Sequence, residues 1–355
     1  MPLVSLIELQ AENLRCVESV QLELHPRCTL IWGENGAGKT SLLEAVFLLG
    51  RGRSFRSRQT EQLIRRTAPK LWVFGRTEGP LPHALGVEFS RDRGIQARLD
   101  GQDVNSLADL TLAFPVQVID PEIHKLIEEG GRRRRRWLDW AVFHVEPQFG
   151  DAWYRYARAL RQRNAALKSR PAEARPWEAE LLEQGERIDA ARRRVVAQLE
   201  PHWHATLSAL DCPHATLTYM AGWSSALAFS EALQAARPRD EARQTTTVGP
   251  HRADLRIGVD HKPARDILSR GQQKLMAAAL TLAQLRLLAA VTEIIPTLLL
   301  DDPAAELDAA HQASFVAEVS RLSCQLVITA LQPEIPGFIQ PGRVFHVEQG
   351  QARSV

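Results

Sequence analysis

Gly33-Glu34-Asn35-Gly36-Ala37-Gly38-Lys39-Thr40 is the stretch that decides the fold. It follows an apolar run, Cys28–Trp32, that predicts a strand, and it precedes Ser41–Leu49, which predicts a helix ended by Gly50. A strand, a loop of the pattern G-x-x-x-x-G-K-[ST] and a helix form a phosphate-binding loop. Its backbone N–H groups and the positive end of the helix dipole face phosphate oxygens. With the strand and helix both in place, a chance match of a glycine-rich turn is disfavoured, and we predict nucleotide binding.

The 355 residues have a nearly neutral net charge of +2, with 45% apolar and 24% charged residues. This is the composition of an ordinary globular protein and not of a disordered chain. Because the overall charge is small, a nucleic-acid surface would have to come from local clusters of basic residues. A chain of this length ordinarily holds two domains, or one domain with an insertion.

The four cysteines are far apart and include no C-x-x-C pair: Cys16, Cys28, Cys212 and Cys324. Such cysteines are most simply small buried hydrophobic residues in a reducing compartment, and no zinc-ligand spacing occurs. The N-terminus lacks the pattern of a signal peptide, and no stretch of about 18 residues is uninterruptedly apolar. We therefore expect a cytoplasmic protein without a membrane partner.

The chain alternates between two kinds of pattern. Residues 3–9 and 19–25 alternate with period two, and short alternating runs between 71 and 100 are separated by turn residues, so an antiparallel meander is expected. From residue 121 glycine becomes sparse and helix formers dominate, and strand–helix alternation returns after Pro238. We predict an α/β fold: a split head with a mixed sheet and a meander at residues 1–120 and 245–355, and a mainly helical arm or lid inserted at residues 121–244.

Two further motifs lie in the last third of the chain. Leu268–Lys274 is a polar segment that opens the apolar helix Leu275–Val291, and it can place a serine and backbone amides against a phosphate. Thr297–Leu300 predicts a buried parallel strand that ends in Asp301 and Asp302. Two acids after a strand can cap a helix, but beside a phosphate loop such a carboxylate is where Mg²⁺ is held. We favour the metal.

Two clusters of arginines are candidates for contact with nucleic acid. The first comprises Arg51, Arg53, Arg56, Arg58, Arg65 and Arg66, and the second is the unbroken run Arg132–Arg136. Like charges in a row favour an anionic partner such as a phosphate backbone, yet a charge run is also the usual sign of a solvated face. Both interpretations stay open. The candidate contacts are Arg51, Arg53, Arg56, Arg132, Arg133, Arg134 and Arg135.

Motifs over nearly the whole chain occur in one order: Glu12–Arg15, Gly33–Thr40, Gly52–Arg56, Pro121-Glu122, Arg136–Asp139, Gln162–Leu167, Gly249–Arg252, Leu268–Lys274 and Asp301–Asp308. In this order the chain resembles an ABC-type ATPase head of the SMC-like branch, and more closely the RecF family of recombination-mediator ATPases. The phosphate loop alone is generic. The Arg163-Asn164 helix, the Gly-Pro-His-Arg element and the serine-glycine-glutamine signature are together specific to the family.

The resemblance implies ATP and Mg²⁺ as cofactors. It implies that Lys39 and Asp302 are catalytic, Asp302 by polarising the attacking water, and that Thr40 and Asp301 hold the metal. Signature residues would reach the γ-phosphate of a nucleotide held by a second protomer, with Asp308 at the dimer seam. The implied nucleotide-binding set is Arg15, Gly33, Asn35, Gly36, Ala37, Gly38, Lys39, Thr40, Ser41, Ser269, Gly271, Gln272 and Asp308.

The sequence departs from transporter-type heads at four places. Asp302 stands where they carry glutamate, and Thr329-Ala330 where they carry a histidine. The signature reads Ser-Arg-Gly-Gln with a single glycine, and Gln117 and Glu122 are rival candidates for the glutamine of the Q-loop. A shorter acid has less reach to the water. These departures indicate a slow switch and not a fast motor.

The function implied by the resemblance is an ATP-dependent dimeric clamp of recombinational repair and replication restart. It would bind gapped DNA at single-strand/double-strand boundaries and help load RecA with RecO and RecR, with hydrolysis driving release. The main alternative is the nucleotide-binding subunit of a membrane transporter; the helical insertion, the missing histidine and the arginine clusters count against it. A P-loop kinase needs no signature, and a long-armed SMC protein needs a much longer insertion.

Overall fold

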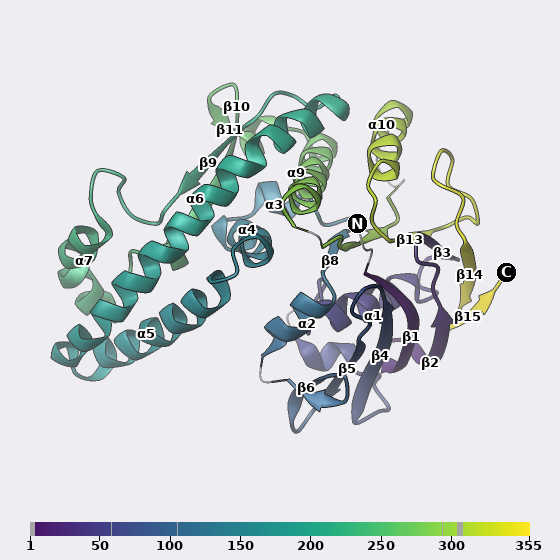
Figure 1. Ribbon diagram of the computed structural model, residues 1–355, viewed down its shortest axis with the longest axis horizontal. Coiled ribbons are helices and arrows are strands. Elements are labelled where there is room, and N and C mark those ends of the chain that lie inside the picture. The colour runs from purple at the N-terminus through teal and green to yellow at the C-terminus, as the bar shows by residue number, and fades with distance from the viewer. Residues whose placement is uncertain (1–3, 58, 105, 293, 304–307) are drawn as a thin grey trace. The chain divides into compact units, whose positions relative to one another are not determined.

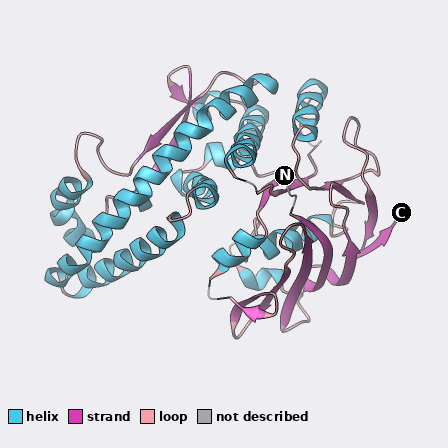
Figure 2. Cartoon of the chain, viewed as in Figure 1, coloured by secondary structure: helices cyan, strands magenta, loops and turns pink. Residues whose placement is uncertain are grey.

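The computed structural model describes residues 4–57, 59–104, 106–292, 294–303 and 308–355. The chain forms two compact units. The first, which we call the head unit, holds Met1–Ile123, Ala209–Asp211 and Leu288–Val355. The second, the helical unit, holds His124–Ser208 and Cys212–Leu287. Strands dominate the head unit and helices dominate the helical unit (Figure 2).

An antiparallel sheet makes up one layer of the head unit, in the strand order β2-β1-β4-β5-β6-β7. Along β4 and β5 buried and more exposed residues alternate, as in a sheet with one packed face. Sequential pairing of β4, β5 and β6 confirms the predicted meander. The strands are β1 (Ser5–Leu14), β2 (Val17–Glu23), β4 (Lys70–Glu78), β5 (Ala84–Ser90), β6 (Gly94–Leu99) and β7 (Gln102–Asp103).

The second sheet of the head unit has the phosphate-loop strand inside it. β3 lies between β13 and β14, both parallel to it, in the order β15-β14-β3-β13-β12-β8 (Figure 1). Parallel strands end at the same edge, so the segments after β3 and β12 are brought together there. The strands are β3 (Cys28–Trp32), β8 (Val116–Ile119), β12 (Thr297–Asp301), β13 (Leu326–Ala330), β14 (Arg343–Glu348) and the antiparallel β15 (Gln351–Ser354).

Helix α1 (Lys39–Arg51) is packed between these two sheets. It contacts β1, β4 and β5 of one sheet and β8, β12 and β13 of the other, and every residue from Ser41 to Gly50 is buried. The helix does not end at Gly50, where the Phe114 carbonyl leaves no room for a side chain; it ends at Gly52, with a φ of +56°. The other helices of the head unit are η1 (Thr60–Leu63), α2 (Leu107–Ala113) and α10 (Ala309–Ser320).

The helical unit combines long helices with a small antiparallel sheet in the order β11-β10-β9. Its longest helices are α5, α6 and α9 (Figure 1). Its strands are β9 (Thr216–Met220), β10 (Asp254–Val259) and β11 (Lys262–Pro263). Its helices are α3 (Lys125–Glu128), α4 (Gly131–Val145), α5 (Phe149–Ser169), η2 (Pro171–Trp177), α6 (Glu178–Ala209), α7 (Phe229–Arg243), η3 (Pro250–Arg252), α8 (Ala264–Ile267) and α9 (Arg270–Val291).

The predicted end of the insertion at residue 244 needs correction. The helical unit extends to Leu287. β10 pairs with β9, with Leu255 opposite Tyr219, and it also contacts α4. Residues 245–287 therefore belong with the helices. Pairing between distant segments leaves no local pattern in the sequence, and the composition alone therefore predicts the boundary too early in the chain.

Helix α9 is apolar enough that a membrane-spanning role has to be considered. Within the described residues it is the one helix long and apolar enough to cross a bilayer, with a mean hydropathy of 1.5. However, 78% of that window is buried inside the protein. The core helix of a globular protein meets the same criterion, so α9 is weak evidence for a membrane span.

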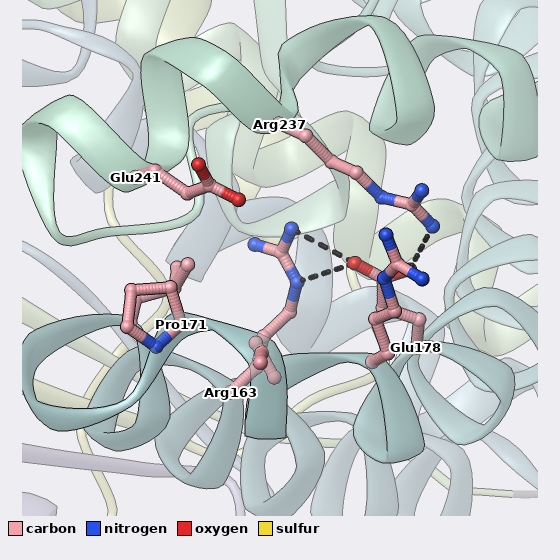
Figure 3. A pocket seen from close by; sticks show the side chains of 9 residues that line it. Arg163, Pro171, Glu178, Arg237 and Glu241 are labelled. Carbon is pink, nitrogen blue, oxygen red and sulfur yellow. Dashed lines mark hydrogen bonds and ion pairs between the residues drawn. The ribbon is translucent and has the colours of Figure 1, made fainter.

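A buried charge network joins α5, α6 and α7. Arg163 is 1% exposed and donates to Glu178 at 3.1 Å, Asp240 at 2.8 Å and the Thr246 hydroxyl at 2.8 Å. Glu178 also accepts a hydrogen bond from Arg237 at 2.6 Å. Figure 3 shows Arg163, Glu178 and Arg237 together at a cavity of about 350 Å³. Buried charges need such pairing, so this network fixes how the three helices pack.

Other motifs named in the sequence analysis also make packing contacts within the helical unit. Asn164 accepts hydrogen bonds from the N–H and the hydroxyl of Thr246, each at 2.7 Å. His251 lies 2.6 Å from the Tyr156 hydroxyl through Nδ1, and burial lowers the pKa of His251 to about 4. Arg192 pairs with both carboxylate oxygens of Asp139 at 2.8 and 3.0 Å. These motifs therefore build the interior of the helical unit.

Candidate nucleotide-binding site

The glycines of the predicted phosphate loop are required by the local backbone. Gly33, Gly36 and Gly38 have φ values of +154°, +81° and +118°, which L-residues with side chains rarely adopt. A Cβ at Gly33 would collide with the Val347 carbonyl oxygen. A Cβ at Gly38 would lie 3.2 Å from the Cys16 sulfur. Neighbouring segments thus press against the loop at both ends.

Lys39, the first residue of α1, folds its side chain back over the loop. Its ammonium donates to the carbonyls of Gly33 at 2.7 Å and Glu34 at 2.9 Å, and the residue is buried. Burial lowers the pKa of Lys39, while the charges of Asp302 and Asp301 act in the opposite direction. A cation held beside the loop in this way can neutralise phosphate.

The acid-tipped strand β12 meets α1 at the same edge of the sheet. The Thr40 hydroxyl donates to Asp301 Oδ1 at 3.0 Å, and Thr329 on β13 donates to the same oxygen at 2.7 Å. Hydroxyl and carboxylate oxygens are the ligands that Mg²⁺ prefers, so this pair fits that ion. Thr329, in the position where transporters carry histidine, instead holds Asp301 through this hydrogen bond.

Asp302 follows directly and has a φ of +50°. Its backbone N–H donates to the Thr329 hydroxyl at 3.0 Å. Burial raises the pKa of Asp302; Lys39 lowers it, and the neighbouring charge of Asp301 raises it further. A carboxylate whose pKa is raised toward neutrality is a stronger base, and it is therefore better suited to accept a proton near neutral pH.

The remaining loop residues have distinct surroundings. Asn35 is exposed, and the Ala37 carbonyl accepts a hydrogen bond from the Gly350 N–H at 2.8 Å. The Ser41 hydroxyl is buried, 3.8 Å from the Cys16 sulfur. The turn between β14 and β15 therefore supports the phosphate loop. Sequence analysis missed this support, and no signal in the sequence pointed to it.

Arg15 is bound by a buried acid that sequence analysis also missed. Both carboxylate oxygens of Glu44 on α1 accept hydrogen bonds from the Arg15 guanidinium, one of them at 3.0 Å. Glu44 is fully buried and also accepts a hydrogen bond from the Ser54 hydroxyl. The next residue, Cys16, touches the loop. Arg15 thus lies beside the phosphate loop, with its charge neutralised by Glu44.

The signature residues belong to the helical unit. The Ser269 hydroxyl accepts from the Gln272 N–H at 3.3 Å, and the Gln272 side chain accepts from the Ser269 N–H at 3.0 Å. This reciprocal capping box begins α9 and could have been recognised as S-x-x-Q in the sequence. Apart from its two chain neighbours and the backbone of its own helix, nothing in the described chain lies within 4 Å of a Cβ built at Gly271.

Asp308 also caps a helix. Its side chain accepts a hydrogen bond from the His311 N–H at 3.0 Å at the start of α10, and its other oxygen lies 2.6 Å from the His311 ring. Of the rest of the predicted loop Pro303–Asp308, residues 304–307 lie outside the described residues.

The first arginine cluster is only partly available to a ligand. The Arg51 guanidinium lies over the Phe47 ring, 5.5 Å from its centroid. Arg53 and Arg56 are exposed. Arg58 lies outside the described residues.

The prediction of DNA contact along the second cluster needs correction. Arg134 is buried and pairs with both oxygens of Asp254 at 2.9 and 3.0 Å. Arg135 donates to the Ala253 carbonyl, and Arg133 pairs with Glu129 at 3.1 Å. Of the four predicted contacts in this run, Arg132 alone is exposed without a partner among the described residues. The run is used mainly to attach α4 to β10.

These features define a P-loop ATPase head of the ABC type: a glycine loop followed by α1 between two sheets, a parallel strand that ends in acids, and an inserted helical unit. The profile described as RecF/RecN/SMC N terminal domain matches residues 5–352. The chain belongs to the RecF family. A transporter subunit is accordingly not favoured.

Relatives and solved structures agree with this assignment. The chain is 39% identical to the DNA replication and repair protein RecF of Stutzerimonas stutzeri, over 98% of this chain and 97% of that protein. It is 40% identical to RecF of Azotobacter vinelandii, over 98% of each. In fold it is similar to the recombination mediator protein RecF with ATP, of the RecFOR pathway, with a TM-score of 0.89, 24% identity and coverage of 99% and 98%. The Smc head domain of Pyrococcus furiosus gives a TM-score of 0.61 at 16% identity, with coverage of 100% and 96%.

Proposed function

We propose that this chain binds ATP with Mg²⁺ at the phosphate loop and hydrolyses it slowly, as a switch. The observation that carries the proposal is the meeting of Thr40, Asp301 and Lys39 at one edge of the mixed sheet. ATP would supply the phosphoanhydride bond that is cleaved, and Mg²⁺ would supply charge neutralisation at its phosphates. The name of a RecF structure solved with ATP agrees with this proposal.

In this proposal each residue of the head unit has a separate task. The loop amides and Lys39 bind phosphate, and Thr40 with Asp301 holds the metal. Thr329 keeps Asp301 in place through its hydroxyl. Asp302 orients the attacking water and takes its proton, which its raised pKa favours. The short side chain of Asp302 supports slow turnover.

We further propose that the site is completed by a second copy of the chain. Ser269, Gly271 and Gln272 would contact the nucleotide held by the other protomer, with Asp308 at the seam between them. The open space beside Gly271 supports this, because the described chain gives no packing reason for glycine in the first turn of α9. ATP would then close the dimer, and hydrolysis would open it.

The cellular role that we propose is recombinational DNA repair in the cytoplasm. The dimer would bind gapped DNA at single-strand/double-strand boundaries and help load RecA together with RecO and RecR. The names of the relatives, which are DNA replication and repair proteins, support this role, as does the RecFOR pathway named with the solved structures.

The dimer is tested by light scattering with Mg²⁺ and a non-hydrolysable ATP analogue. Wild type should become dimeric, and Ser269→Arg should stay monomeric. Ser230→Arg on α7 is the matched control, because Ser230 is an exposed serine of the same unit. A wild-type protein that stays monomeric with the analogue would overturn the composite site.

The DNA role is tested by measuring affinity for gapped and blunt duplex DNA, with and without ATP, over a series of salt concentrations. We expect tighter binding to gapped DNA and a further gain with ATP. Equal affinity for both DNAs under all conditions would contradict the proposed preference.

A further inference from the structure

The two units carry opposite net charges that cancel over the whole chain. The helical unit has 27 Lys and Arg residues against 18 Asp and Glu residues, a net charge of +9. The head unit has 17 against 24, a net charge of −7. The whole-chain value of +2 conceals this asymmetry. An anionic polymer would be attracted to the helical unit and repelled by the head unit.

Within the helical unit, α5 presents an unusual stripe of residues. Tyr154, Arg158, Arg161 and Lys168 are all exposed. Their spacing of four, three and seven residues places them on one face of the helix. No acidic residue occurs from residue 152 to residue 172. We call these four residues the α5 stripe.

The basic residues of the α5 stripe have no acidic partner, whereas three arginines near them or on the adjoining helix do. Arg155 pairs with Glu180 at 2.6 Å, Arg170 with Glu173 at 3.1 Å and Arg187 with Glu183 at 2.8 Å. In contrast, the side chains of Arg158, Arg161 and Lys168 have no ion pair or hydrogen bond to any other residue that the structure describes. A merely solvated helix face usually interleaves both signs of charge. This face does not.

We propose that the α5 stripe is a contact surface for the phosphate backbone of DNA, and this inference rests on the proposed DNA-binding function. From Tyr154 to Lys168 the stripe is about 21 Å long at roughly 1.5 Å per residue, which matches about six base-pair steps of 3.4 Å. Tyr154 is 65% exposed and offers an aromatic face to a sugar or an unpaired base. The arginines at residues 133–135, which are engaged within the protein, are not this surface.

The test is the salt dependence of DNA affinity for the triple variant Arg158→Ala, Arg161→Ala, Lys168→Ala. Each lost phosphate contact reduces the slope of log affinity against log salt by about 0.9, so the slope should fall by about 2.7. At 0.1 M salt this corresponds to roughly 500-fold weaker binding. The probe is gapped DNA with the ATP analogue. The melting temperature should be unchanged because all three side chains are exposed.

A matched control removes three positive charges that are already neutralised: Arg155→Ala, Arg170→Ala and Arg187→Ala. It changes the net charge of the helical unit by the same amount, so a general field effect would lower both slopes equally. A slope change below one for the control, with the full change for the stripe variant, supports the proposal.

The other outcomes separate this inference from the proposed function. Equal slopes for the two variants, or a stripe variant that binds like wild type, overturn the stripe while DNA binding stands. Wild-type protein that fails to bind DNA overturns the proposed function and the stripe together. If vesicles containing anionic lipid bind through the stripe and DNA does not, the surface is a membrane contact and the proposal is overturned.

Discussion

Substituting Arg163 by methionine should destabilise the helical unit strongly. The methionine fills most of the space of the arginine stem but leaves the buried acids Asp240 and Glu178 without their shared cation. Asp240 keeps its bonds from Thr247, at 2.9 Å from the N–H and 2.6 Å from the hydroxyl, and Glu178 keeps Arg237. Removing one partner of a buried ion pair costs about 3–5 kcal/mol. We expect a loss in that range.

The measurement is hydrogen exchange of the amides of α5 and α7 at increasing urea, because a local readout suits a chain of two units. Arg161→Met, on the same helix and exposed without a partner, is the control and should change stability by about 0.5 kcal/mol or less. Adding Asp240→Asn to the Arg163 variant removes one stranded charge and should restore about 1–2 kcal/mol. A cost below about 1 kcal/mol for Arg163→Met, or no restoration, would refute the view that this network holds the helices together.

Three other outcomes are expected. The ATPase rate of wild type should fall on acidification, and the midpoint of that fall should lie above the ordinary pKa of an aspartate, because burial raises the Asp302 pKa. Asp302→Asn should abolish turnover and keep ATP binding, as measured by equilibrium dialysis. The free energy of unfolding should fall as the pH drops from about 6.5 to about 4, by up to about 1.4 kcal/mol per pH unit, because unfolded chains protonate His251 while the folded protein does not. His251→Gln should reduce this dependence on pH, as measured by urea unfolding at each pH. Gly33→Ala should reduce the melting temperature and nucleotide binding, whereas Gly271→Ala should fold normally and lose only ATP-dependent dimerisation; dimers of the Gly271 variant would contradict the composite site.

Much of the head could be predicted because its signals are local. The phosphate loop, the apolar strand before it and the paired acids Asp301 and Asp302 are each contiguous in sequence. The meander was visible because its strands alternate with period two and pair in order. Local patterns were therefore enough to predict the phosphate loop and the paired acids, which meet at one edge of the mixed sheet.

What could not be predicted depends on contacts between distant segments. Five arginines in a row look alike in sequence, yet Arg134 is buried because Asp254 faces it, 120 residues away. Glu44 reads as an ordinary polar residue of a helix, and its burial follows from the second sheet that covers α1. The charge asymmetry of the two units was likewise hidden until their boundaries were known.

The position of β3 between β13 and β14 has a consequence for synthesis of the chain. Both neighbours of β3 come from residues 326–348, and the Ala37 carbonyl of the phosphate loop accepts a hydrogen bond from the Gly350 N–H. A ribosome that adds about 5–20 residues per second makes these partners roughly 15–60 s after β3. During that interval β3 lacks both of its neighbours in the mixed sheet, while residues 124–208 and 212–287 of the helical unit are being synthesised. Nucleotide capture therefore has to wait until translation has passed residue 350.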